Sequence, residues 1–91
     1  MTNSHYIIIK GMKTNVKTKK KILKQIGERI KLYRKLAKLS QETLAFDIGV
    51  DRTYIGGIEQ GLKSPSLYCL FMIAKRLNLD FKTLLDIDMD I

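Results

Sequence analysis

The sequence has few of the residues on which catalytic and metal sites depend. Its 91 residues include one cysteine, Cys69, and one histidine, His5. A single cysteine excludes an internal disulfide, and these two residues are too few to ligate a transition metal. The acids near the end, Asp86, Asp88 and Asp90, lack the glycine and closing glutamate of a calcium loop. No candidate nucleophile has a base nearby, so we expect neither an enzyme nor a metal or cofactor.

Long apolar segments are also missing. The sequence contains neither a secretory signal peptide nor an apolar run long enough to cross a bilayer. Together with the lone cysteine, this predicts a protein of the reducing cytoplasm that does not enter membranes. At this length the chain forms one domain with a modest core.

Acidic residues are scarce in the first part of the chain. The whole sequence has 17 Lys and Arg against 9 Asp and Glu, a net charge of +8. Between Lys10 and Lys38 the only acid is Glu28, whereas acids outnumber bases after Leu39. Such an imbalance suits a polyanion, with nucleic acid as the first candidate and an anionic membrane surface as a weaker one. A solvated lysine run from Lys17 to Lys21 explains part of the charge equally well.

Residues 1–20 show no helical period, and we interpret them as a flexible basic arm. Tyr6 to Ile9 are β-prone, but Gly11 and a polar stretch interrupt them. If ordered, this apolar stretch would pack on a neighbouring subunit or pair as a strand. Met12 is an alternative translation start. The arm is also a possible binding segment for a protein partner.

The predicted domain spans residues 21–91 and begins with an amphipathic helix. From Lys21, apolar residues recur at helical spacing. They are Ile22, Ile26, Ile30, Tyr33 and Ala37.

Two short helices with a very tight turn between them follow. Ser40 can cap a helix from Gln41 to about Asp47, because its hydroxyl can accept from a free backbone N–H of the first turn. Gly49 can end that helix in a left-handed conformation, and Asp51 is a new N-cap. The next helix, from Arg52 to about Gln60, stops at Gly61.

Two further helices complete an all-α chain of five. After a loop at Pro65, Ser66 caps a helix whose inner side carries Leu67, Leu70, Ile73 or Ala74, and Leu77. Asn78 can end it. Asp80 begins a last short helix that carries Phe81, Leu84 and Leu85.

The run LSQETLAFDIGVDRTYIGGIEQG at residues 39–61, followed by SPS at 64–66 and LNL at 77–79, resembles the Cro/repressor-type (XRE-like) helix-turn-helix family. Within that family it looks most like the controller proteins of restriction-modification systems. The resemblance covers about residues 22–85. It implies a lambda-repressor-like domain that regulates transcription by binding double-stranded DNA, as a homodimer on a palindromic operator.

The resemblance places base reading at Arg52, Thr53 and Gly57. A guanidinium fits the O6 and N7 acceptors of guanine, and threonine offers a hydroxyl and a methyl group suited to thymine. An ordinary surface arginine paired with Asp51 or Glu59 is the alternative for Arg52. Relatives often carry a longer residue where this chain has Gly56 and Gly57. The two glycines either let the backbone approach DNA closely or simply leave fewer side chains to reach the bases.

Contacts with the DNA backbone are implied for one residue of the first motif helix and four of the second helix and its loop. They are Gln41, Tyr54, Gln60, Lys63 and Ser64. A half-buried packing role is equally open for Tyr54. Glu59 matches a family residue with a structural role.

The end of the chain has more apolar residues than a short helix needs to cover the core of its own subunit, so we expect some of them to form a two-fold interface. The predicted interface residues are Leu79, Phe81, Leu84 and Leu85, although all of them could instead close the core of one subunit. A second functional hypothesis is an antitoxin that binds both its operator and a protein toxin, with residues 1–20 as the toxin-binding segment.

Overall fold

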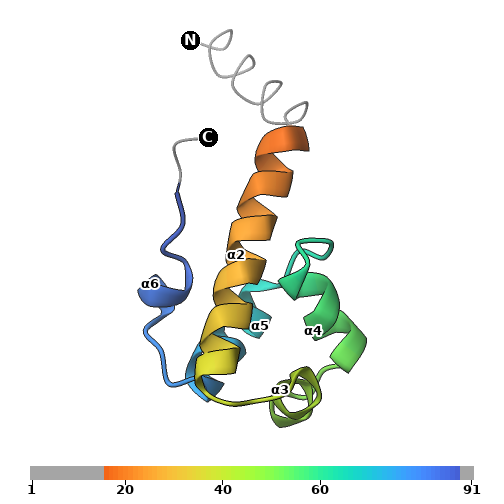
Figure 1. Ribbon diagram of the computed structural model, residues 1–91, viewed down its shortest axis with the longest axis vertical. Helices are drawn as coiled ribbons and strands as arrows, with labels where there is room; N and C mark the ends of the chain where they lie inside the picture. Colours follow the sequence, from red (N-terminus) through yellow and green to blue (C-terminus); the bar gives the residue numbers. More distant parts are fainter. Residues whose placement is uncertain (1–15, 89–91) are drawn as a thin grey trace, which may run out of the picture.

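The computed structural model describes residues 16–88, which form five helices and no strand (Figure 1). The expected all-α architecture is confirmed. The helices are α2 (Val16–Leu36), α3 (Gln41–Ile48), α4 (Arg52–Glu59), α5 (Leu67–Arg76) and α6 (Phe81–Leu84). The interpretations of His5, the stretch Tyr6 to Ile9, Met12 and Asp90 lie outside the described residues.

Helix α2 begins at Val16, five residues before the predicted start. Residues 16–20, expected in the flexible arm, are therefore helical. Their lysines carry no apolar period that could have predicted this, yet lysine is a good helix former when its side chain lies in water. The helix ends at Leu36 and the chain turns through Lys38, whose φ is 60°. Ala37 consequently lies beyond the helix and is exposed, which corrects its placement on the inner face.

Helix α2 forms the long axis of the molecule and meets α4 at a glycine (Figure 1). A Cβ at Gly27 would lie 2.2 Å from the carbonyl oxygen of Ile58, which no side chain can occupy. Ile30 is fully buried three residues later, and Ile26 and Tyr33 are partly buried beside it. The close approach of the two backbones fixes α4 firmly against α2.

The predicted caps of the two motif helices are confirmed. Ser40 Oγ accepts from the Thr43 N–H at 2.9 Å, and Asp51 Oδ1 accepts from the Thr53 N–H at 3.0 Å. Gly49 ends α3 with φ 77°, a conformation that is costly for residues with a Cβ. Only three residues separate the two helices, and this short turn sets α4 across α3.

Helix α5 begins directly after its predicted cap, Ser66, whose Oγ accepts from the Cys69 N–H at 3.0 Å. Leu67 is 64% exposed, so its predicted inward position is wrong. It lies in the first turn and faces out. Asn78, with φ 57°, ends the helix as expected.

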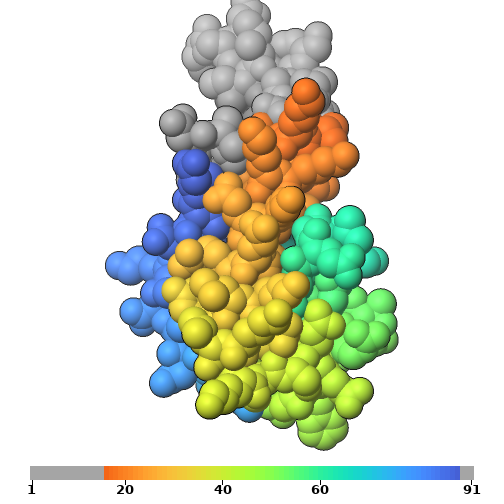
Figure 2. Space-filling view, viewed as in Figure 1, coloured from red at the N-terminus to blue at the C-terminus, as the bar shows by residue number. Residues whose placement is uncertain are grey.

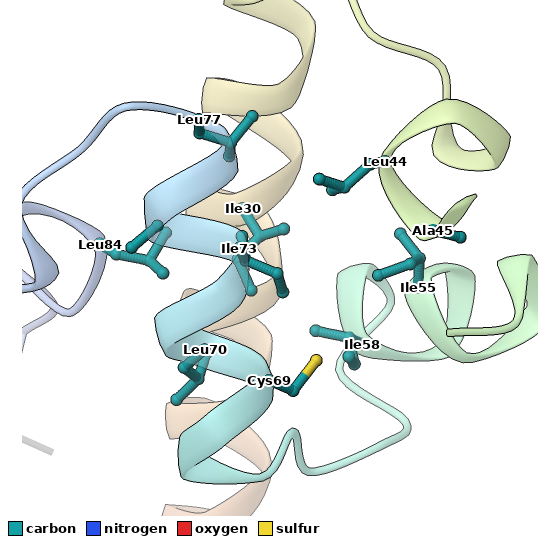
Figure 3. Close-up of a cluster of buried hydrophobic side chains, with 11 residues drawn as sticks. Ile30, Leu44, Ala45, Ile55, Ile58, Cys69, Leu70, Ile73, Leu77 and Leu84 are labelled. Carbon is teal, nitrogen blue, oxygen red and sulfur yellow. The ribbon is translucent and has the colours of Figure 1, made fainter. Parts of the chain in front are cut away.

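One core joins all five helices (Figure 3). It consists of Ile30, Leu44, Ala45, Ile55, Ile58, Cys69, Leu70, Ile73, Ala74, Leu77 and Leu84. Burial raises the pKa of the Cys69 thiol, and a hydrogen bond with Tyr54 opposes this shift less strongly. The thiol stays protonated at neutral pH and acts as a small apolar group.

Leu84 is fully buried in this core. Its predicted place in a dimer interface is therefore wrong, because its side chain closes the core of a single subunit. Residues 85–88, which follow Leu84, lie beside α2 (Figure 1). Arg29 donates to the Thr83 carbonyl, and Gln25 exchanges two hydrogen bonds with the backbone of Asp88, at 3.0 and 2.7 Å.

Candidate nucleic-acid interface

Helix α4 has one anchored face and one exposed end. Ile55 and Ile58 are buried, whereas Arg52 and Thr53 are exposed in its first turn. This division follows from the sequence, since the two isoleucines of RTYIGGIE lie three apart and Arg52 and Thr53 come before them. The helix therefore presents its N-terminal side chains to solvent while its other face is held in the core.

A buried ion pair anchors the C-terminal end of α4 to α2. Arg34 Nε donates to Glu59 Oε2 at 2.6 Å, and its Nη2 donates to Glu59 Oε1 at 3.0 Å. The two side chains are only 8% and 2% exposed. Arg34 Nη1 also donates to the Leu39 carbonyl at 2.6 Å, which ties the entry to α3 into the same cluster. Glu59 has the structural role expected of it, and its partner Arg34 belongs to this buried pair rather than to the basic surface.

Gln41 extends this cluster to the exposed end of α4. Its Nε2 donates to Glu59 Oε1 at 2.9 Å, and its Oε1 accepts from Arg52 Nη1 at 3.3 Å. Glu59 can only accept, so it sets which way the amide of Gln41 points and turns the amide oxygen toward Arg52. An amide nitrogen has two hydrogens, so the predicted phosphate contact of half-buried Gln41 would use the second one.

Arg52 is exposed and donates to the neutral Gln41 rather than pairing with Asp51 or Glu59. The structure therefore does not contain the surface ion pair that was the alternative for Arg52. Its guanidinium has five N–H groups, and one bond to Gln41 leaves the others able to meet acceptors outside the protein.

Tyr54 is half-buried, which matches the packing interpretation. Its hydroxyl accepts from the Ser66 N–H at 3.3 Å and hydrogen bonds with the Cys69 thiol. Tyr54 thus joins α4 to the cap of α5. The other predicted backbone contacts, Gln60, Lys63 and Ser64, are exposed on the loop between these helices.

The two adjacent glycines of α4 have different surroundings. Gly56 is buried, and a Cβ there would lie 3.6 Å from Gln41 Oε1, an ordinary contact. Gly57 is half-buried, and a Cβ there would lie 2.5 Å from Lys63 Cγ. Gly56 therefore faces inward and offers no backbone to DNA, while Gly57 lies under a lysine side chain.

Exposed lysines of α2 lie beside the surface formed by the first turn of α4 and the loop that follows it. Gly61, in the loop after α4, would place a Cβ 3.0 Å from the Cα of Lys24. In Figure 2 the orange N-terminal half of α2 and the teal loop lie next to each other on one face. The exposed lysines of this half are Lys17, Lys19, Lys20, Lys21 and Lys24.

Within residues 16–88, no group of three His, Cys, Asp or Glu side chains is placed to hold a metal ion. None of the helices described is both long enough and apolar enough to span a bilayer.

Fold and exposed helix end together define a DNA-binding transcription regulator of the helix-turn-helix class. The family model described as Helix-turn-helix matches residues 30–84, more than half of the chain. The chain therefore belongs to this family, in its Cro/repressor (XRE-like) form.

Restriction-modification control proteins are among its relatives. The control protein C.SmaI of Serratia marcescens is 40% identical over 60 residues, which are 66% of this chain and 71% of that protein. The crystal structure of the controller protein C.AhdI of Aeromonas hydrophila has a TM-score of 0.66 and 40% identity over 68% of this chain and 94% of that one. The biofilm regulator SinR, solved in complex with DNA, has a TM-score of 0.64 and 40% identity over 67% of this chain and 98% of that one.

Proposed function

We propose that this protein binds a specific double-stranded DNA sequence as a homodimer and thereby controls transcription. The observation that carries the proposal is the exposed first turn of α4, with Arg52 bonded to the Arg34–Glu59–Gln41 cluster and Thr53 exposed beside it. A helix presented in this way fits the major groove of B-DNA, with its N-terminal side chains on the base edges.

Each residue of this surface has a chemical role in the proposal. The Arg52 guanidinium donates to O6 and N7 of guanine, and the Thr53 hydroxyl and methyl group meet an adjacent base. Gln41, Gln60 and Ser64 donate to phosphates and fix the position of α4 along the groove. Tyr54 acts from inside by joining α4 to α5.

The lysines of α2 supply affinity without sequence information. They lie beside the loop after α4, so a duplex engaged by α4 and this loop can meet them along its backbone. Neutralising phosphates releases counterions, which makes the affinity depend steeply on salt. The relatives support the assignment, since C.SmaI is a control protein and SinR was solved with DNA.

The dimer forms, in this proposal, through an apolar patch made by Leu67, Tyr68, Phe71 and Phe81. Phe71 is 52% exposed, and its ring stacks on Phe81 with centroids 4.3 Å apart. Leu67 and Tyr68 lie four and three residues before Phe71, on the same face of α5, and are exposed as well. Exposed aromatic side chains clustered in this way are typical of protein interfaces. A shallow hollow lined by Phe81 and Leu85 lies beside the patch, and a side chain of the second subunit can bind in it.

Selection of bound sites from random duplex DNA tests the proposal. We expect enrichment of a two-fold symmetric site whose half-sites are about 34 Å apart, one turn of B-DNA. Recovery of DNA without a common sequence, at the same affinity as the unselected pool, would contradict it.

A further inference from the structure

The missing side chain at Gly57 leaves room for another residue. Position 57 lies four residues after Thr53, so the two share the exposed face of α4. A Cβ at Gly57 would lie 2.5 Å from Cγ, 3.5 Å from Cβ and 3.7 Å from Cδ of Lys63. The aliphatic part of Lys63 therefore occupies the space that a residue-57 side chain would fill.

The turn after α4 holds Lys63 in this place. The N–H groups of Leu62 and Lys63 both donate to the Gly57 carbonyl, at 2.9 and 3.1 Å. Gly61, with φ 77°, reverses the chain so that the loop folds back over the helix. The Lys63 backbone is thus fixed to Gly57, and its side chain lies over the same residue.

We propose that Lys63 is a specificity-determining residue that reads a base from the surface of α4. Its ammonium stands in for the side chain absent at Gly57 and donates to O6 and N7 of a guanine in the major groove. Gly57 is the positioning residue, because any Cβ there displaces the lysine. This inference rests on the proposed function, since it requires α4 to lie in the groove.

The loss of a base contact and the loss of a phosphate contact by Lys63 would change DNA affinity in different ways. Removing a base contact lowers affinity at one base pair and leaves nonspecific binding nearly unchanged. Removing a phosphate contact lowers affinity on every sequence and reduces the salt dependence.

A double-mutant cycle on the selected site tests the inference. The four proteins are the wild type, Gly57→Ala, Lys63→Ala and the double variant, measured by fluorescence anisotropy on the site, its single-base-pair variants and unrelated DNA. We expect Lys63→Ala to weaken specific binding about tenfold or more, with the loss confined to one base pair of each half-site. Gly57→Ala should weaken it in the same way, and the double variant should bind no worse than Lys63→Ala.

Two control variants separate this effect from helix stability and charge. Gly56→Ala makes the same change one residue earlier, where the new methyl group meets only an ordinary contact, and should leave specificity intact. Lys75→Ala removes an exposed charge from α5 and should do the same. Additive losses in the cycle, or equal loss on all DNAs for Lys63→Ala, would overturn the inference. Absence of any selected site for the wild type would instead refute the proposed function itself.

Discussion

The two ends of this domain share one apolar core, but the chemistry at their surfaces differs. The α3–α4 end is joined by directional polar bonds that run from buried Arg34 and Glu59 through Gln41 to Arg52. At the α5–α6 end, hydrogen bonds of Arg29 and Gln25 hold the chain to α2 through backbone atoms only. The surface of this end is apolar, with the stacked rings of Phe71 and Phe81. Hydrogen bonds fix the orientation of a side chain, whereas apolar contacts depend on area and tolerate small shifts.

This difference matches the two tasks in the proposal. Reading a base edge requires a donor held in one orientation, and the polar cluster orients Arg52 from inside the protein. Pairing with a second subunit requires exposed apolar area, which the α5–α6 end supplies. Substitutions at the two ends should therefore affect different properties of the protein.

The largest expected effect is at the buried ion pair. Glu59→Ala leaves the guanidinium of Arg34 buried without its partner, and we expect the free energy of unfolding to fall by about 3–5 kcal/mol. Urea unfolding followed by circular dichroism measures this. The matched control is Asp47→Ala, which removes the 2.6 Å ion pair with Arg76, where the side chains are 39% and 28% exposed. That control should cost less than about 1 kcal/mol, and equal losses for the two variants would contradict the assigned role of burial.

The second-largest effect on the free energy of unfolding is expected at the contact between α2 and α4. Gly27→Ala drives a methyl group into the Ile58 carbonyl, and we expect a loss of about 1–3 kcal/mol or more despite the better helix propensity of alanine. Gly56→Ala, on α4, meets no such obstacle and should raise stability by about 0.5–1 kcal/mol. The same unfolding experiment checks both. A stabilising Gly27→Ala would show that the two helices do not approach so closely.

A third prediction concerns the apolar end. Phe71→Ser removes an exposed ring from the α5–α6 patch, so it should weaken dimer formation by about 1–2 kcal/mol while the monomer stays folded. Sedimentation equilibrium and circular dichroism measure the two properties. Phe46→Ser is the control, because Phe46 is 83% exposed on α3 and is not one of the patch residues. Unchanged association of Phe71→Ser, or equal weakening by Phe46→Ser, would place the interface elsewhere.

The smallest effect is expected from the basic part of α2. Replacing Lys17, Lys19, Lys20 and Lys21 with glutamine should reduce the slope of log affinity against log salt by about 0.9 for each phosphate that these lysines neutralise in the wild type. The preferred sequence should stay the same, because these lysines read no bases. Binding titrations at several salt concentrations measure the slope. An unchanged slope would show that these lysines remain in solvent.

Much of the fold could be predicted because its helix ends depend on local chemistry. Ser40, Gly49, Asp51 and Ser66 each act on neighbouring backbone groups, so the sequence alone indicates where α3, α4 and α5 begin or end. The start of α2 could not be found in this way, since its first turns have neither a predicted cap nor a regular apolar pattern.

The residues of the site and core that could not be predicted from the sequence depend on contacts between distant segments. Arg34 resembles its basic neighbours in the sequence, and only the position of Glu59, 25 residues later, makes it a buried residue. Leu84 and Leu67 are both leucines near helix starts or ends, yet one is fully buried and the other 64% exposed. Gly57 suggested a thinner reading surface, while the structure places the Lys63 side chain there. Local pattern cannot distinguish these cases, because tertiary packing decides them.

In the proposed function, the polar end of the domain reads bases through Arg52. The most direct measurement compares Arg52→Ala with the wild type on the selected site and on unrelated DNA at one salt concentration. We predict a loss of about 1–3 kcal/mol on the selected site and almost none on unrelated DNA. Equal losses on both DNAs would contradict the claim, since Arg52 would then contact only the phosphate backbone.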